Sequence, residues 1–327
     1  MNILVVGWYG HNNCGDESYL LSIPKLFPSI KFDFVNAIDK SKLFLYDAVI
    51  LGGGNVFKSS FLSDLKNIKD KPIYGFSIGA EQAIETDIKF SHIYAREYFS
   101  VDVFKKIGIP CSFLPDAAFI LDGDKNKGKK YISKYFNDAK NDLYSKVVVI
   151  IINSYLVKGG LSDLAKDSAT FLKFSYDMAR IIDETSASFL FLPFGTSIPS
   201  DDRVPNSWIA SKCKYCNKNC VIFDKLDVQT TLDIISAADL VVSSRLHSSI
   251  FSFSEGVPFI DITHHSKNRN FLTLVDKNDI SVSFWNFDID LLKDKISEGL
   301  NKTRNQAESI KIKSFLRESA NAIRFDR

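Results

Sequence analysis

The chain has 327 residues, 45% of them hydrophobic, which is enough for two domains that each bury a core. Its 41 basic and 39 acidic residues give a net charge of +2 without a basic stripe, so the composition argues against nucleic acid as a partner. We see no apolar stretch of membrane-spanning length and no signal-peptide pattern, and we expect a cytoplasmic protein.

Short apolar runs alternate with amphipathic segments in the first half of the chain. The runs predict strands at Ile3–Val6, Phe32–Val35, Ala48–Leu51, Ile73–Phe76 and Ile93–Ala95. The segments predict helices near Glu17–Leu26, Ser60–Ile68 and Val101–Ile107. Continuous apolar strands separated by helices indicate a parallel sheet covered on both faces. A polar, lysine-rich stretch follows at 122–130, so we expect an N-terminal domain over residues 1–125 and a linker over 126–145.

The same alternation restarts after this stretch. Strands are predicted at Val147–Ile152, Phe189–Leu192, Val221–Phe223, Leu240–Val242 and Phe259–Ile262. Helices are predicted at about Asp163–Glu184, Val228–Ala237, Arg245–Glu255 and Leu291–Leu300, with another near the carboxyl end. The fold class is therefore α/β, with two Rossmann-like doubly wound domains facing a central cleft. The C-terminal domain spans 146–327, and its last helix is a candidate for packing back on the N-terminal domain.

Residues 243–258 are the most informative stretch. A strand runs into a serine cap, and the helix that follows carries Arg245 and His247 in its first turn. Leu246, Ile250 and Phe253 form its buried stripe, so we expect the arginine and the histidine to face the cleft. Free backbone N–H groups at a helix start attract anions, an arginine can grip a carboxylate or phosphate, and a histidine can move a proton.

Three glycine-containing turns follow strands of the first domain. They are the segments at 7–17, 52–54 and 75–79, and Arg96 follows the next strand. Glycine allows tight turns and a close approach of the backbone to a ligand. Asp16 occupies the position of a helix N-cap. In doubly wound sheets ligands bind beyond the carboxyl ends of the strands, so these turns are expected to rim one site. Neither a dinucleotide-binding fingerprint nor a P-loop is present.

Cys213, Cys216 and Cys220 form a C-x2-C-x3-C pattern. Three thiols at this spacing could hold zinc or part of an iron–sulfur cluster, but no fourth ligand is evident nearby. The alternative is a reduced, solvated loop. We therefore assign no metal and keep the three cysteines as an alternative metal site.

These motifs together resemble the polysaccharide pyruvyl transferase family. The carboxyl motif S-R-x-H-x-x-I, then G-x-P and a lysine, is matched by Ser244, Arg245, His247, Ile250, Gly256, Pro258 and Lys267. The amino-terminal N-x-G-D-E and the central G-G-G are matched by Asn13, Gly15, Asp16, Glu17, Gly52, Gly53 and Gly54. Arg96, Ser100 and Asp116 also fit. The chain departs from the family pattern at Gly75–Ala80, at His264 in place of an aromatic residue, and in the loop 213–220.

The resemblance implies a GT-B-like fold and transfer of pyruvate from phosphoenolpyruvate onto a sugar of a cell-surface polysaccharide or its precursor, as a cyclic ketal. Phosphoenolpyruvate is then a co-substrate, and no cofactor is required. The implied donor-binding residues are Ser244, Arg245, Leu246, His247, Arg96 and Lys267. The implied catalytic residues are His247 as general acid or base, Arg245, and Asp16 as a second base.

The implied acceptor is a saccharide, free or lipid-linked, so contact with the inner face of the membrane is an open possibility. Its binding residues are expected to be Tyr9, Asn13, Gly15, Asp16, Glu17, Gly53, Gly54 and His264. Two other functions stay open: a nucleotide-sugar glycosyltransferase of the same architecture, and a non-catalytic module that binds an anionic metabolite. No nucleic acid and no transmembrane segment are expected, and the oligomeric state is not predicted.

Overall fold

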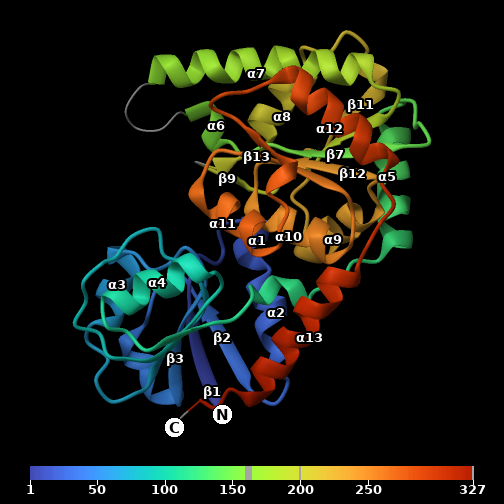
Figure 1. Ribbon diagram of the computed structural model, residues 1–327. Coiled ribbons are helices and arrows are strands. Elements are labelled where there is room, and N and C mark those ends of the chain that lie inside the picture. Colours follow the sequence, from blue (N-terminus) through green and yellow to red (C-terminus); the bar gives the residue numbers. More distant parts are fainter. Residues whose placement is uncertain (159–163, 199, 326–327) are drawn as a thin grey trace. The chain divides into compact units, whose positions relative to one another are not determined.

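A computed structural model of the chain describes residues 1–158, 164–198 and 200–325 (Figure 1). The chain divides into two compact units. Unit 1 consists of Met1–Leu121 and Ile310–Arg327, and unit 2 consists of Asp122–Ser309. Each unit contains its own six-stranded sheet. The cleft predicted between them stays a prediction.

Unit 1 is built on a parallel sheet with strand order β2-β1-β3-β4-β5-β6. Its strands are β1 (Asn2–Val6), β2 (Lys31–Val35), β3 (Ala48–Gly54), β4 (Ile73–Ile78), β5 (Phe90–Ala95) and β6 (Cys111–Phe113). Its helices are α1 (Cys14–Glu17), α2 (Tyr19–Leu26), α3 (Ser59–Leu65) and α4 (Tyr98–Lys106), with 3-10 turns η1 (Lys40–Leu45) and η2 (Ala117–Ile120). The final helix, α13 (Ala307–Ala322), lies mostly in this unit.

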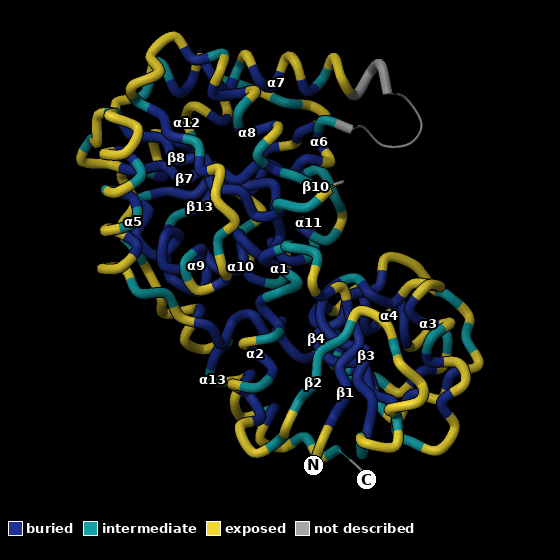
Figure 2. Tube along the Cα trace, turned by 180° about the vertical axis from the view of Figure 1, so that it is seen from behind, coloured by how far each residue is buried: buried dark blue, intermediate teal, exposed yellow. Residues whose placement is uncertain are grey.

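Aliphatic residues of the central strands form the core of unit 1. On one face Leu4, Val49 and Leu51 pack with Phe61 and Phe104 from α3 and α4. On the other face aromatic rings meet: Phe27 packs edge-on against Phe76 and Phe325, and Phe325 also packs against Tyr74. The strands β3 and β4 lie buried along their length, and β1 is buried except at Asn2 (Figure 2). Continuous apolar strands are typical of a parallel sheet covered on both faces.

Unit 2 repeats the design with strand order β11-β8-β7-β12-β13-β14, again all parallel. The strands are β7 (Val147–Ile151), β8 (Ser188–Phe191), β11 (Asn219–Val221), β12 (Leu240–Ser243), β13 (Phe259–Thr263) and β14 (Ser281–Ser283). The helices are α5 (Lys125–Asp138), α6 (Tyr155–Lys158), α7 (Leu164–Glu184), α8 (Arg203–Ala210), α9 (Val228–Ala237), α10 (Leu246–Ser254), α11 (Ser266–Leu274) and α12 (Ile289–Asn301). Shorter pieces are β9 (Thr196–Ser197), β10 (Ser200–Asp201), η3 (Cys216–Lys218) and η4 (Asn278–Ile280).

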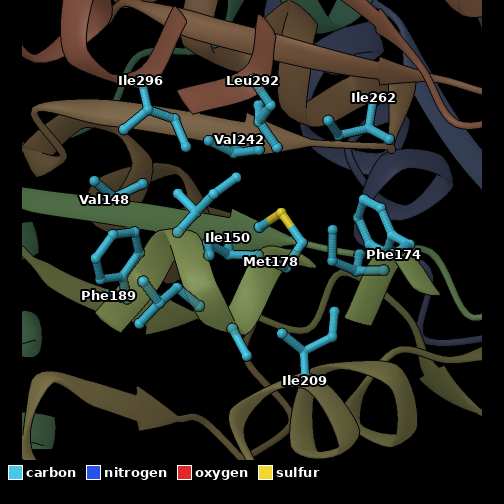
Figure 3. Close-up of a cluster of buried hydrophobic side chains, with 14 of the residues drawn as sticks. Val148, Ile150, Phe174, Met178, Phe189, Ile209, Val242, Ile262, Leu292 and Ile296 are labelled. Carbon is cyan, nitrogen blue, oxygen red and sulfur yellow. The ribbon is translucent and has the colours of Figure 1, made fainter. Parts of the chain in front are cut away.

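Alternate residues of the unit 2 strands point to two different helix layers. Val148, Ile150 and Val242 pack against Phe174 and Met178 of α7, and the same cluster includes residues of α8 and α12 (Figure 3). Figure 1 shows α9, α10 and α11 on the opposite side of this sheet from α7. Helix α10 is buried over all nine of its residues, so it is a central helix rather than a half-exposed one.

Most predicted elements form where the sequence places them, but the predicted linker does not. Residues 125–138 form helix α5, capped by the Asp124 side chain, and this helix is part of unit 2. A Cβ at Gly128 would lie 1.9 Å from the carbonyl oxygen of Asp233, so α5 packs directly on α9. The long helix predicted from Asp163 is α7, and Asp163 itself lies outside the described residues. Among the described residues, no helix is both long enough and apolar enough to cross a bilayer.

Candidate active site

The candidate site of unit 2 forms at the carboxyl edge of its sheet. Strands β7, β8, β12 and β13 run parallel, so the segments that follow them all emerge at this edge. These segments begin at Ile152, Leu192, Ser244 and His264. Arg245 and His264 follow the neighbouring strands β12 and β13 at this edge.

Arg245 is held by a buried carboxylate. Its Nε lies 3.0 Å from Oδ2 of Asp202, and its Nη2 lies 2.5 Å from Oδ1, so the pair is bidentate. Nη2 also donates to the Ser200 hydroxyl at 3.1 Å. Arg245 is 8% exposed and Asp202 is fully buried. The sequence predicted a free guanidinium at this point, and the structure corrects that expectation. The role of Arg245 in donor binding stays a prediction.

One edge of the Arg245 guanidinium has no partner. Within residues 1–158, 164–198 and 200–325, no acceptor bonds to Nη1, which carries two N–H groups. The Asp202 pair thus fixes the Nε and Nη2 edge and leaves Nη1 available. A planar guanidinium fixed in this way retains donors for an incoming carboxylate or phosphate.

Asp202 also joins three loops of the sheet edge. Its Oδ1 accepts the Ser154 amide at 2.9 Å, and its Oδ2 accepts the amides of Phe194 and Gly195 at 3.1 and 3.0 Å. These amides follow β7 and β8, whereas Arg245 follows β12. A buried carboxylate with five donors is well satisfied, so one side chain fixes the relative positions of three strand ends.

The start of α10 differs in detail from the prediction. The N-cap is Arg245 and not Ser244, and it makes no side-chain cap bond. The Arg245 amide instead donates to the Ser243 hydroxyl at 2.9 Å, and the Ser244 hydroxyl accepts the amide of Asn153 at 2.7 Å. His247 lies in the first turn and is 9% exposed. Helix α10 is buried on all sides, so both side chains are largely covered, and the expectation that they face the cleft stays a prediction.

A second group of polar residues follows β13. Burial lowers the pKa of His264 to about 3, and the charges of Lys267 and His265 add to this effect. His264 is therefore neutral at physiological pH. Its Nδ1 is buried and has no partner among the described residues. His265 caps α11, with its Nδ1 accepting the amide of Lys267, and Lys267 lies in the first turn of that helix.

Beneath this group, Asp261 is a fully buried acid in β13. Its carboxyl group accepts from the Ser249 hydroxyl of α10 at 2.8 Å, from Thr263 at 2.8 Å and from the Asn268 amide of α11 at 2.8 Å. Burial raises its pKa, while the three hydrogen bonds act in the opposite direction. Asp261 thereby fixes the starts of α10 and α11 to one strand.

The predicted acceptor residues of unit 1 come together around the first glycine turn. The Asn13 side chain donates to Asp16 Oδ2 and also caps α1, so the N-cap is Asn13 and not Asp16. A Cβ at Gly54 would lie 2.7 Å from Asp16 Oδ1, so the carboxylate lies against the second glycine turn. Tyr9 donates its hydroxyl to the carbonyl of Gly52 at 2.7 Å.

Glu17 closes the same turn. Its Oε1 accepts the amides of Gly10 and His11 at 2.8 and 3.1 Å. Glu17 is therefore occupied in shaping the loop. Burial raises the pKa of Tyr9, and the negative charges of Asp16 and Glu17 add to the shift, so the phenol stays protonated.

Arg96 lies in a buried network of its own unit. Its Nη1 is 3.3 Å from Asp116 Oδ2 and 3.3 Å from the Tyr19 hydroxyl, and its Nη2 donates to Asn55 Oδ1 at 2.6 Å. Tyr19 also donates to Asp116 at 2.8 Å. Arg96 is 4% exposed. The expectation of an Arg96 side chain free for the donor is corrected to a guanidinium engaged within unit 1.

Several polar residues of these networks were not found from the sequence. They are Asp202, Ser200 and Asp261 in unit 2 and Tyr19 and Asn55 in unit 1. The pairs Arg245–Asp202 and Arg96–Asn55 are 43 and 41 residues apart, so no local spacing connects them. Position gave a partial signal, because Asn55 follows β3, Asp202 follows β10 and Tyr19 begins α2. Ser200 begins β10 and Asp261 is the middle residue of β13, so position did not mark them.

The three cysteines of the loop 213–220 donate to three different carbonyl oxygens. Cys213, Cys216 and Cys220 contact the carbonyls of Ile209, Cys213 and Tyr135. Burial raises the pKa of Cys213 to about 12 and that of Cys220 to about 11, so both are thiols. Among the described residues, no group of three or more histidine, cysteine or acidic side chains could hold a metal ion.

The family model of polysaccharide pyruvyl transferase matches residues 13–266, most of the chain. The chain belongs to the polysaccharide pyruvyl transferase family. The matched range includes both polar networks, from Asn13 and Asp16 through Arg96 to Arg245 and His247, and Lys267 follows it directly. This confirms the family resemblance inferred from the sequence. The search of curated proteins finds no match.

Solved structures share the fold at low identity. UDP-GlcNAc 2-epimerase from Methanocaldococcus jannaschii, in complex with UDP-GlcNAc and UDP, has a TM-score of 0.61 at 13% identity, over 98% of this chain and 99% of that chain. The Neisseria meningitidis enzyme bound to UDP-GlcNAc has a TM-score of 0.58 at 11% identity, covering 98% and 99%. Glycosyltransferase VinC in complex with DTDP has 0.53 at 7% identity, covering 98% of both chains. These likenesses show the fold alone, which is GT-B-like with two Rossmann-like units.

Proposed function

We propose that this family member transfers pyruvate from phosphoenolpyruvate onto a saccharide and forms a ketal across two hydroxyls of the acceptor. Family membership supports a pyruvyl transferase of polysaccharide synthesis. The observation that carries the choice of donor is the Arg245 guanidinium, which Asp202 fixes at the start of α10 while its Nη1 edge has no partner among the described residues. A carboxylate or a phosphate is the group that such an edge favours, and phosphoenolpyruvate carries both.

Several cationic and dipolar groups of unit 2 support binding of that donor. The first-turn amides of α10, beginning with Leu246, have no partner within the helix and carry its positive dipole end. Lys267 opens α11, which follows the neighbouring strand β13. Arg245 and these amides would bind the carboxylate or the phosphate, and Lys267 would neutralise the departing phosphate. Ser244 would act indirectly, because its hydroxyl is bonded to the Asn153 amide.

The reaction requires two proton transfers that balance its bonds. The methylene carbon of phosphoenolpyruvate gains a proton and becomes a methyl group, while an acceptor hydroxyl adds to the neighbouring carbon. The bond from that carbon to the phosphate oxygen then breaks, and the second hydroxyl adds to close the ketal. The two acceptor hydroxyls release two protons in total. One balances the proton that the methylene carbon gains, and the other leaves on the phosphate. His247 would serve as general acid or base in these transfers.

The acceptor is assigned to the polar turns of unit 1. Asp16, held by Asn13 against the turn at Gly54, would accept hydrogen bonds from sugar hydroxyls or act as a second base. Gly53 and Gly54 both have positive φ, and the absence of a side chain at Gly54 lets the backbone turn lie directly against the Asp16 carboxylate.

The proposal is tested by following phosphate released from phosphoenolpyruvate with and without a panel of bacterial saccharides. Replacing His247 by alanine should lower acceptor-dependent release by about 100-fold or more, because general acid–base catalysis contributes at least that much. Arg245→Lys should weaken donor binding, since an ammonium cannot keep the bidentate pair with Asp202 and also present the two N–H groups of Nη1. The matched control is His92→Ala, whose imidazole in β5 bonds to Ser112 outside the proposed site.

Two results would contradict the proposal. One is full activity of the His247 variant. The other is thermal protection of the protein by a nucleoside diphosphate with none by phosphoenolpyruvate, which would instead favour a nucleotide-sugar glycosyltransferase. Circular dichroism and melting temperature of each variant separate loss of chemistry from loss of fold.

A further inference from the structure

Helix α8 presents an apolar outer face to solvent. Its inner residues, among them Ile209 and Ala210, are buried in the core of unit 2. Its outer residues Val204 and Trp208 are 59% and 43% exposed, and Phe223 beside them is 61% exposed. These three side chains line a shallow hollow of about 410 Å³ together with Arg203, Ser207 and Ser211. We call Val204, Trp208 and Phe223, with Tyr176 of α7, the α8 patch.

Lys212 lies against the α8 patch, and Lys214 and Lys218 belong to the segment between α8 and β11. Residues 203–223 contain four basic residues and no acidic residue, in a chain that is otherwise nearly neutral. The Lys212 Nζ lies 4.3 Å from the ring centre of Trp208 and 5.5 Å from that of Tyr176, so it joins α8 to α7. Lys214 and Lys218 lie 5.1 and 5.4 Å from the ring of Tyr215, which is also exposed.

The acidic side chains that precede Lys212 on α7 and in β10 interact with groups other than Lys212. Asp201 forms an ion pair with Arg203 at 2.6 Å. Asp183 accepts the backbone amides of Lys214 and Tyr215, and Asp177 is paired with Lys173 on α7. Among the described residues, no ion pair involves Lys212, Lys214 or Lys218. The patch is therefore apolar in its centre, with Lys212 and Arg203 beside it, and the nearby carboxylate of Asp224 accepts from the Tyr135 hydroxyl at 3.0 Å.

We propose that the α8 patch docks on an anionic lipid bilayer. Tryptophan and tyrosine favour the interface between lipid headgroups and acyl chains, because their rings combine apolar area with a polar end. Lysines beside them are attracted to anionic headgroups while their stems cover apolar surface. An exposed apolar face with cationic side chains beside it fits this partner better than a neutral protein surface, which offers nothing to the lysines.

The position of the patch suggests what docking achieves. Helix α8 begins one residue after Asp202, and Arg203 donates to the carbonyl of Thr196 in the loop that also carries Ser200. The helix that would rest on lipid is thus the direct continuation of the segment that fixes Arg245. The inference goes beyond the proposed reaction and does not require it, because vesicle binding is measured without donor or acceptor.

Co-sedimentation with vesicles tests the proposal. The full chain should bind vesicles of phosphatidylglycerol and phosphatidylcholine, bind pure phosphatidylcholine at least about tenfold more weakly, and lose binding as salt is raised. The double variants Trp208→Ser, Phe223→Ser and Lys212→Glu, Lys214→Glu should each bind at least about tenfold more weakly. Matched controls in unit 1 are Phe44→Ser, at a residue that is 77% exposed, and the exposed Lys89→Glu.

Tryptophan fluorescence gives a second measurement. The chain has three tryptophans, so Trp8→Phe with Trp285→Phe leaves Trp208 as the reporter, and its emission should shift to the blue on anionic vesicles. Equal binding to both kinds of vesicle, or unchanged binding by both double variants, would overturn the proposal. So would the absence of vesicle binding together with dimers that the Trp208 and Phe223 substitutions dissociate, since the patch would then bind a second copy of the chain.

Discussion

At the scale of single residues, the ion pair of Arg245 and Asp202 determines what the unit 2 site can bind. A buried pair contributes little net stability compared with apolar residues, because desolvation offsets the attraction. Its value lies in geometry: Asp202 orients the guanidinium and ties three loops to it. The sequence predicted the arginine, the histidine two residues later and their place at a helix start. It did not predict the carboxylate, because Asp202 is brought near only by the sheet.

Replacing Asp202 by asparagine should lower the free energy of unfolding by about 3 kcal/mol or more, since it leaves a buried guanidinium without its counter-charge. Chemical denaturation measures the change. Asp201→Asn is the control, because Asp201 pairs with Arg203 nearer the surface and should lose no more than about 1 kcal/mol. Equal losses of unfolding free energy in the two variants would show that the buried pair of Asp202 and Arg245 is no more important for stability than the pair nearer the surface.

His264 predicts a pH dependence with a definite sign. Its folded pKa of about 3 is below the ordinary 6.5, so between these values the unfolded chain binds a proton that the folded chain does not. Stability should therefore fall as pH drops from 7 to 5, by up to about 1.4 kcal/mol per pH unit from this residue below 6.5. Asp261, whose pKa is raised, acts in the opposite direction. Unfolding free energies of the wild type and of His264→Gln, each measured at pH 7 and pH 5, isolate the contribution of the histidine. An equal loss of stability in the two proteins between these pH values would contradict the lowered pKa of His264.

At the scale of elements, glycine turns at the strand ends bring the unit 1 residues together. Gly53 has a φ of +64°, and a Cβ there would lie 2.0 Å from the ring of Tyr19. The sequence predicted three such turns at one sheet edge, and the periodicity of apolar residues was sufficient for that. It could not show that Tyr19 fills the space beside Gly53, or that residues 125–138 form a helix, because the lysines of α5 are simply its solvent face.

Gly53→Ala should destabilise unit 1 and displace Tyr19 from Asp116. Two effects contribute at Gly53: the strain of a positive φ and the clash of a Cβ with Tyr19. Gly10→Ala separates them, since Gly10 also has a positive φ but a Cβ there meets nothing within 4 Å. The Gly10 variant should lose only the backbone strain, about 1–2 kcal/mol, and the Gly53 variant more. Melting curves of the two variants give the comparison, and an equal loss in both would mean that the ring of Tyr19 is not the obstacle.

At the scale of the whole molecule, the chain consists of two Rossmann-like units and belongs to the polysaccharide pyruvyl transferase family. The alternation of strands and helices predicted both sheets, and the ordered motifs from Asn13 to Lys267 predicted the family. The burial of α10 was not predictable from its own pattern, because Ser248, Ser249 and Ser252 read as polar yet bond to backbone or side-chain oxygens inside the unit. The three serines therefore look polar in the sequence but are buried in the structure, where each hydroxyl has a hydrogen-bond acceptor.

A crystal of the protein soaked with phosphoenolpyruvate gives the decisive observation. We expect electron density for the donor at the Nη1 edge of Arg245 and the first turn of α10, with the Asp202 pair intact. Density at another place, or a nucleoside diphosphate occupying this position where phosphoenolpyruvate at saturating concentration does not, would contradict this expectation.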